Sequence, residues 1–251
     1  MNWVWKKGLR GYKLFELFKE GFIKTFIRDN RYKVFVEGFK NTMIITIVAA
    51  LIGIMIGVFV SFVHTLADSA RDRHSKTLGA RVLIALDKFC NAYVAVMRGT
   101  PLAIQLMIMT FIIMGGFPNK VIVCCIAFGV NSGAYVSEVI RGGIASVDKG
   151  QTEAGRALGL TQIGTLRLIV LPQAIKNILP ALCNEAIAVL KETSIVGLVS
   201  VVDLTRAGDL VRSRTMSPYF TLISVAIVYF ILVFGLSKAV KRLEIKMAQS
   251  K

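Results

Sequence analysis

Long runs of apolar residues alternate with short polar and basic segments along most of this chain. Residues 43–63 carry no charge, and a helix of that length can cross a hydrocarbon layer of about 30 Å. Four further apolar runs follow at 91–114, 121–140, 177–198 and 219–237. A segment in lipid must satisfy its own backbone hydrogen bonds, so the pattern predicts about five transmembrane helices in an all-α polytopic membrane protein.

The first two runs carry further structural signals. Gly53 and Gly57 lie four residues apart on one helix face, a spacing that lets a second helix approach closely. In the second run, residues 82–90 are apolar but carry Asp87 and Lys88, and Pro101 follows. We expect 82–90 to lie along the inner membrane surface and the span to kink around residues 98–101. Two separate spans in this region are the alternative.

Residues 1–40 are basic and aromatic. Leu14, Phe18, Phe22 and Phe26 recur every four residues, which predicts an amphipathic helix in the plane of the membrane interface. A helix packed on the flank of the protein itself would explain the same pattern. These features divide the chain into a basic amphipathic segment at 1–40, a membrane domain at 41–240 and a basic tail at 241–251.

Composition supports the membrane assignment. Hydrophobic residues make up 55% of the 251 residues and the mean hydropathy is +0.63, which argues against a soluble domain. The net charge of 31 − 15 = +16 is typical of loops facing anionic lipid, so we expect contact with membrane lipid and not with nucleic acid. No cleavable signal peptide is expected before the first run.

Basic loops indicate which ends of the spans face inward. Lys and Arg residues place segments 65–81, 141–176 and 238–251 on the inner side, and 202–218 then forms an external loop. Five spans put residues 1–40 outside, although that segment holds ten Lys and Arg residues. The three other basic segments agree with the five-span arrangement, which we therefore retain.

The polar segment at 146–176 has the pattern of two short helices. Asp148 and Gln151 have the spacing of a capping box, Gly159 occupies a stop position, and Thr161 can cap a second helix. Leu171-Pro172 is expected to end that helix, and Gly159 is expected to have a positive φ. A DNA-binding helix-turn-helix has a similar pattern but requires a soluble domain, which the flanking spans argue against.

The fourth run carries charges within the membrane. Asn184, Glu185, Lys191 and Glu192 share one helical stripe with the small residues Ala181 and Ala188. Glu185 lies about 12 Å along the run, near mid-bilayer. Buried charges in a membrane normally face a cavity or a bundle interior, so Asn184 and Glu185 are expected to line a solute route. Lys191 and Glu192 are expected to form a structural pair. The alternative is that the charges only hold helices together.

Four motifs together resemble a known family. The residues Glu153, Ala154, Gly159, Ile169, Leu171 and Pro172 resemble the EAA loop of ABC-importer permeases, although Gly155 replaces the usual second alanine. The segments 98–102 (RGTPL), 131–135 (NSGAY) and 184–194, which includes NE and LKETS, resemble the polar amino acid branch of that family. The resemblance covers most of residues 40–240. It places Arg98, Asn131, Tyr135 and Glu138 on the substrate route with Asn184 and Glu185.

The resemblance implies a transmembrane subunit of a type I ABC importer in the cytoplasmic (inner) cell membrane. Its partners would be a second permease subunit, in a homodimer or heterodimer, two ABC ATPase subunits inside and a solute-binding protein outside, with an amino acid as substrate. ATP and magnesium would bind the ATPase partners, so this chain itself needs no cofactor and is not an enzyme. An ion-coupled secondary transporter is the main alternative, but we see no internal repeat of the kind that class carries.

The remaining chemistry in the sequence is sparse. No GxxxxGK[ST] phosphate loop occurs, so the chain cannot hold ATP by that route. The four cysteines form no CxxC pair and are expected to be free buried thiols without a metal. His64 and His74 are too few and too far apart to suggest a ligand cluster, and neither has an evident catalytic partner.

Overall fold

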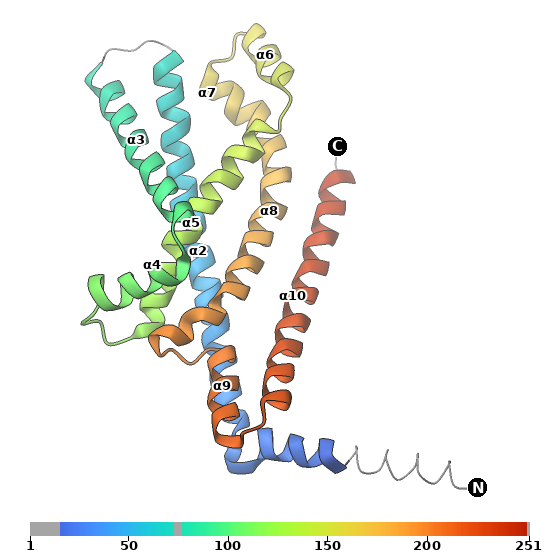
Figure 1. Ribbon diagram of the computed structural model, residues 1–251. Coiled ribbons are helices and arrows are strands. Elements are labelled where there is room, and N and C mark those ends of the chain that lie inside the picture. The colour runs from blue at the N-terminus through green and yellow to red at the C-terminus, as the bar shows by residue number, and fades with distance from the viewer. Residues whose placement is uncertain (1–15, 73–76, 250–251) are drawn as a thin grey trace.

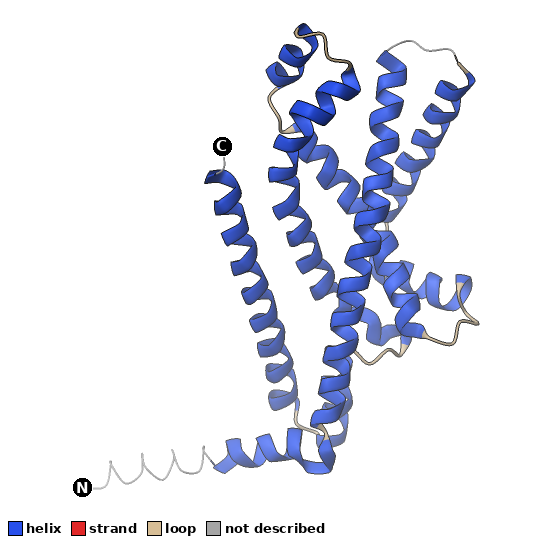
Figure 2. Ribbon diagram, turned by 180° about the vertical axis from the view of Figure 1, so that it is seen from behind, coloured by secondary structure: helices blue, strands red, loops and turns tan. Residues whose placement is uncertain are grey.

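A computed structural model describes residues 16–72 and 77–249, and all regular structure in this part of the chain is helical (Figures 1 and 2). The elements are η1 (Ile23–Ile27), η2 (Arg28–Asn30), α2 (Tyr32–Asp72), α3 (Leu78–Gly99), α4 (Leu102–Ile108), η3 (Met109–Ile113), α5 (Lys120–Ala145), α6 (Lys149–Ala157), α7 (Gln162–Thr165), η4 (Leu166–Val170), α8 (Leu171–Glu192), η5 (Thr193–Val199), α9 (Leu204–Thr215) and α10 (Pro218–Gln249).

The prediction of about five spans is confirmed. Four continuous helical stretches, containing α2, α5, α8 and α10, are long and apolar enough to cross a membrane. A fifth candidate is the pair formed by α3 and the segment Leu102–Ile113, which is bent by 110°. The bend falls at Thr100-Pro101, within the predicted kink, because proline cannot continue the hydrogen bonding of α3.

The prediction that 82–90 follows the inner surface is wrong. These residues belong to α3, which runs beside α2 (Figure 1). The carboxylate that suggested a surface position, Asp87, is 1% exposed because Arg71 and His64 of α2 bind it. A buried carboxylate with such partners is compatible with a packed helix.

Glycines set the contact between α2 and α5, as the spacing of Gly53 and Gly57 predicts. A Cβ on Gly53 would lie 2.8 Å from Oγ of Ser132, and a Cβ on Gly57 would lie 2.3 Å from Cγ1 of Val136. On the facing helix, a Cβ on Gly129 would lie 2.6 Å from Ile52. Small residues on both helices therefore allow their backbones to approach closely.

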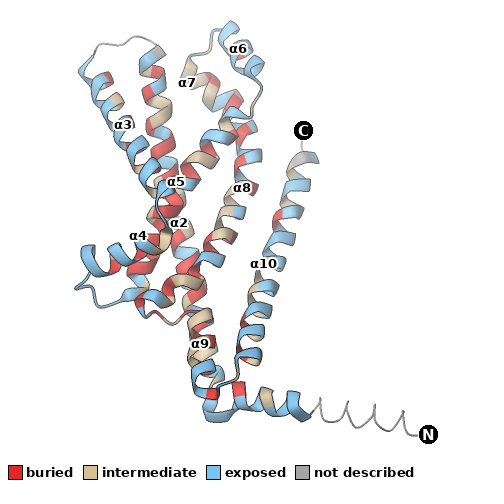
Figure 3. Cartoon of the chain, in the orientation of Figure 1, coloured by how far each residue is buried: buried red, intermediate tan, exposed pale blue. Residues whose placement is uncertain are grey.

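The buried part of the molecule is centred on α5 and the middle of α2, whereas α10 is largely exposed along its length (Figure 3). Phe128 of α5, Ile45 of α2 and Leu190 of α8 are each at most 1% exposed. Cys90, Cys124 and Cys125 are buried free thiols, as expected, while Cys183 is only partly buried.

The N-terminal segment turns sharply into the first span. Residues 16–27 are helical and run at a steep angle to α2 (Figure 1). The turn uses left-handed φ angles of 57° at Asp29 and 53° at Asn30, which these two residue types tolerate better than most. The ring of Phe18 lies 5.3 Å from that of Phe220, so the helix packs partly on the protein's own flank. Leu14 lies outside the described residues.

The two ends of the bundle are built differently. One end carries α6, α7 and the C-terminal end of α10, and the other carries α9 and the N-terminal helix (Figure 1). The predicted loop at 202–218 is mostly the helix α9, whose N–H groups at Thr205 and Arg206 donate to Asp203 at 2.8 and 3.0 Å. Burial raises the pKa of the Asp203 carboxyl above its ordinary value.

Candidate functional site

The predicted pair of short helices forms a compact unit, α6–α7, at one end of the bundle. Asp148 caps α6 by accepting from the N–H of Gly150 at 2.7 Å. Thr161 caps α7 by accepting from the N–H of Gly164 at 3.0 Å. The predicted positive φ of Gly159 is confirmed at 85°. The caps read from the sequence therefore set the boundaries of both helices.

Backbone hydrogen bonds close α6 in a Schellman motif around Gly159. The N–H of Gly159 donates to the carbonyl of Arg156 at 3.0 Å, and that of Leu160 donates to the carbonyl of Gly155 at 3.1 Å. Gly155 also has a packing reason to be small. A Cβ there would lie 2.6 Å from Cγ2 of Thr165 and 2.8 Å from Cδ1 of Ile169.

The expectation that Leu171-Pro172 ends the second short helix is wrong. The helix continues through η4, a π-helical segment, into α8 without a break. Pro172 comes just after η4, where the N–H of Leu171 donates to the carbonyl of Leu166 in a π-type hydrogen bond that carries the helix past the proline. The unit is therefore joined rigidly to the fourth span. Gln173 adds a tether, because its Nε2 donates to the carbonyl of Ile169 at 2.9 Å and to Oε1 of Gln151 at 3.3 Å.

Apolar side chains are exposed on the α6–α7 unit. Leu158 is 81% exposed, Leu168 64% and Ile163 47%. Glu153 and Ala154 are also exposed, whereas Ile169 is partly buried against α6. An apolar patch on a protruding end is typical of a surface that binds another protein.

Within the spans, Glu185 of α8 faces α5. Its Oε1 accepts a hydrogen bond from Oγ of Ser132 at 3.0 Å. Glu185 is partly buried and Asn184 beside it is exposed. Among the described residues, no other hydrogen bond to the Glu185 carboxylate is found, so Oε2 remains able to accept one from a solute.

Three further predicted residues, Arg98, Tyr135 and Glu138, come together on another side of α5. Nη1 of Arg98 lies 3.0 Å from Oε2 of Glu138, and its guanidinium carbon lies 5.6 Å from the centre of the Tyr135 ring. Arg141 also binds Glu138, at 2.7 and 3.1 Å. The result is a charged group shared between α3 and α5.

Asn131 holds the bend between α3 and α4. Its Nδ2 donates to the carbonyl of Met97 at 3.2 Å and to Oε1 of Gln105 at 2.8 Å. Gln105 donates in turn to Oγ1 of Thr100 at 2.7 Å and to its carbonyl at 3.0 Å. Because these bonds occupy the amide of Asn131, its position supports a structural contribution to the bend. Gln105 was not among the predicted site residues, although its polarity within an apolar run was an available signal.

Lys191 and Glu192 lie at the end of α8, and both are exposed. In the described part of the chain, no ion pair within 4.0 Å joins them. Lys191 instead lines an outer groove with Ser194, Thr205 and Tyr229. Their predicted role as a structural pair stays a prediction.

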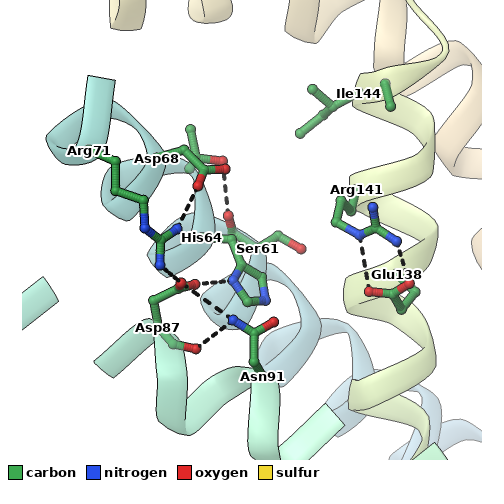
Figure 4. A pocket seen from close by; sticks show the side chains of 11 residues that line it. Ser61, His64, Asp68, Arg71, Asp87, Asn91, Glu138, Arg141 and Ile144 are labelled. Atoms are coloured by element: carbon green, nitrogen blue, oxygen red, sulfur yellow. Dashed lines mark hydrogen bonds and ion pairs between the residues drawn. The ribbon is translucent and has the colours of Figure 1, made fainter. Parts of the chain in front are cut away.

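A polar cleft of about 510 Å³ lies between α2, α3 and α5 (Figure 4). It is lined by Ser61, His64, Thr65, Asp68, Arg71, Asp87, Asn91, Glu138, Arg141, Ile144 and Ala145. On one side Asp87 binds His64 and Arg71, and on the other Glu138 binds Arg141.

His64, for which the sequence suggested no catalytic partner, contacts Oδ1 of Asp87 through its Nδ1 in this cleft. His74 lies outside the described residues. The sequence held a signal for this cluster. His64, Asp68 and Arg71 have the i, i+4, i+7 spacing of one helix face, but their partner lies on another helix.

Comparisons with known proteins agree with this architecture. Residues 77–248 match the family described as "Binding-protein-dependent transport system inner membrane component". The chain is 38% identical over 215 residues to a provisionally named glutamine transport system permease protein, GlnP, of Rickettsia conorii, covering 84% of this chain and 92% of that one. It is 36% identical over 212 residues to the arginine transport system permease protein ArtQ of Bacillus subtilis, covering 82% and 90%.

A solved structure is also similar. It is described as an amino acid ABC transporter with histidines, with a TM-score of 0.74 and 34% sequence identity over 86% of this chain and 94% of that one. The family match spans well over half of the chain, including α5, the α6–α7 unit and α8. This chain therefore belongs to the family of binding-protein-dependent transport system inner membrane components and is a transport permease.

Proposed function

We propose that this chain is the transmembrane permease subunit of an ABC importer that carries a polar amino acid across the cytoplasmic membrane. The observation that carries the proposal is Glu185, a partly buried carboxylate within a span, whose Oε1 accepts a hydrogen bond from Ser132. A carboxylate at this depth can accept from an ammonium, an amide or a guanidinium group of a solute. Permease relatives named for glutamine and for arginine support this substrate class.

In this proposal the α6–α7 unit receives the force of ATP hydrolysis from two ATPase subunits. The unit exposes the apolar side chains of Leu158, Ile163 and Leu168, and a continuous helix leads from it to Glu185 in α8. A push on the patch can therefore reach the solute site through one helix, in which Pro180 is a possible bending point. This end faces the cytoplasm, and ATP and magnesium are held by the partner subunits.

At the opposite end, the α9 side faces outward and receives a solute-binding protein. A second permease subunit completes the membrane part and covers some of the apolar surface that α10 leaves exposed. Asn184 is exposed beside Glu185 and can donate to the solute carboxylate. An ion-coupled mechanism has no support from the relatives, which are permeases of transport systems.

The test of the coupling surface is co-purification of the permease with the ATPase subunits in mild detergent. Leu158→Asp places a charge on the most exposed apolar side chain of the unit, and we expect it to reduce the recovered ATPase at least tenfold. Met216→Asp is the matched control, since Met216 caps the C-terminal end of α9, is 86% exposed and has a left-handed φ of 52° that Asp tolerates. Equal recovery of ATPase with both variants would contradict the assignment of this surface.

A further inference from the structure

The cleft between α2, α3 and α5 is not used by the Glu185 site. Its volume of about 510 Å³ lies within the range of small-molecule sites, about 300–1,000 Å³. Its lining includes Arg71 and Ala145, in the last turns of α2 and α5, whereas Glu185 faces α5 from α8. The cleft therefore requires its own explanation.

One wall of the cleft is a rigid network on α2 and α3 (Figure 4). The Asp87 carboxylate is 1% exposed and accepts hydrogen bonds from His64 and Arg71. Arg71 also donates to Asp68 at 2.7 Å, and the Asp68 side chain is 67% exposed. The buried carboxylate fixes the guanidinium of Arg71 in place, so this wall presents a preorganised cation beside an accessible carboxylate.

The facing wall, on α5, has the same composition. Glu138 is held by Arg141 at 2.7 Å and by Arg98 at 3.0 Å. The Arg141 side chain is 63% exposed and Glu138 is 26% exposed. Each wall therefore offers a guanidinium with free donors next to a carboxylate with free acceptor capacity.

This arrangement selects against ligands with a single sign of charge. An anion such as phosphate would meet the carboxylates of Asp68, Asp87 and Glu138, and a simple cation would meet the two arginines. A zwitterion can place its carboxylate on a guanidinium and its ammonium on a carboxylate within one small molecule. We propose that the cleft is a second binding site for a zwitterionic amino acid, on the cytoplasmic side of the permease.

The identity of the ligand rests on the proposed function, since the solute that leaves Glu185 would be the one that reaches this cleft. The two sites lie along the same helix. Ser132, which binds Glu185, precedes Glu138 by six residues, about 9 Å along α5. Tyr135 lies between Ser132 and Glu138 in the sequence, and the Arg98 side chain that contacts its ring also binds Glu138. The cleft is thus an exit site that a released amino acid occupies before entering the cytoplasm.

The test is equilibrium binding of radiolabelled L-glutamine and L-arginine to the permease–ATPase complex in nanodiscs, without ATP and without binding protein. The Glu185→Gln background weakens the first site. We expect the Glu185→Gln protein to retain residual binding. Adding Asp68→Asn and Arg141→Gln together should weaken that residual binding at least tenfold. Arg81→Gln is the matched control, because Arg81 is an exposed arginine of α3 that does not line the cleft.

Chemical probes and a conservative variant sharpen the result. Arg141→Lys keeps the charge but loses the forked donor geometry, and we expect an intermediate loss. Inorganic phosphate at equal concentration should not displace the amino acid, and agmatine, which lacks the carboxylate, should bind at least tenfold more weakly than L-arginine. Displacement by phosphate, or residual binding unchanged by the paired substitutions, would overturn the site.

Loss of all binding in Glu185→Gln alone would also overturn it, since a single site would then be enough. Both substituted side chains are mostly exposed, and recovery of the assembled complex by gel filtration checks that the variants fold. A different result would contradict the proposed function, namely the absence of ATP-driven uptake by the unmodified complex. The binding measurement tests whether the cleft holds an amino acid, and its outcome does not depend on the uptake result.

Discussion

Glu185 is the residue on which the solute route depends. Its carboxylate contacts Ser132 at 3.0 Å, and Glu185→Gln keeps the size of the side chain while removing its charge. We expect this variant to lower transport, most strongly for cationic amino acids, because the attraction for a guanidinium or ammonium is lost. Complex assembly should change little.

The measurement is uptake by reconstituted transporter alongside thermal stability. Glu244→Gln serves as the control, since it makes the same chemical change at an exposed position near the end of α10. If Glu185→Gln takes up every amino acid at the rate of the unmodified protein, the carboxylate lies outside the route and a purely structural role is favoured.

Gly159 is the residue on which the geometry of the α6–α7 unit depends. Its φ of 85° costs a residue with a side chain about 1–2 kcal/mol, and a β-branched residue is hindered further. We expect Gly159→Val to misalign α6 and α7 and to reduce ATP-driven uptake at least tenfold, while the protein still inserts in the membrane.

Gly142→Val provides the comparison for that variant. Gly142 is helical, and a Cβ there meets no atom within 4 Å. Normal ATP-driven uptake by Gly159→Val would remove the basis for a coupling role.

What could be predicted at the residue scale depended on local patterns. The caps at Asp148 and Thr161 and the left-handed Gly159 follow from neighbouring residues, and the structure confirms them. The partners of Glu185 and Asp87 could not be read in this way. Ser132 lies 53 residues from Glu185, and Arg71 lies on a different helix from Asp87, so their contacts depend on packing.

Among the elements, the contact between α2 and α5 was the most predictable because it depends on small residues at fixed spacing. Gly57→Ala should overpack it, since the new Cβ would lie 2.3 Å from Cγ1 and 2.6 Å from Cβ of Val136. Overpacking of this kind costs about 1–3 kcal/mol, so we expect a fall of several degrees in melting temperature.

Gly235→Ala in α10 is the matched control. Its Cβ would meet nothing within 4 Å, and alanine favours a helix over glycine. Equal melting temperatures for Gly57→Ala and the unmodified protein would show that α2 and α5 do not approach as closely as described.

Two element boundaries were predicted wrongly for physical reasons. Pro172 was expected to end a helix, but the π-helical turn before it carries the helix into α8 without a break. Residues 82–90 were placed at the surface because of Asp87, but two partners on α2 allow that carboxylate to be buried in α3. A sequence pattern shows that a residue is charged, but it does not show that side chains of another helix neutralise that charge.

At the scale of the whole molecule, the proposed function places the α6–α7 end in the cytoplasm and the α9 end outside. A cysteine replacing Ser213 in α9 should react with an impermeant thiol reagent only from outside. A cysteine replacing Thr152 in α6 should react only from inside, because both positions are exposed at opposite ends. A cysteine at Ser75, which lies outside the described residues, is likewise expected to react only from inside.

The unmodified protein is the control for this labelling, since its native thiols are buried or, at Cys183, partly buried. Reaction of the Ser213 position from inside, or of the Thr152 position from outside, would contradict the proposed orientation and the cytoplasmic position of the α6–α7 unit.

The central claim, uptake of a polar amino acid driven by ATP on partner subunits, is tested most directly in proteoliposomes. These would contain the permease, its ATPase subunits and its solute-binding protein, with radiolabelled glutamine or arginine offered on the binding-protein side. We predict accumulation that requires ATP on the ATPase side and is unaffected by collapsing proton and sodium gradients. Accumulation that needs an ion gradient and proceeds without ATP would contradict the account.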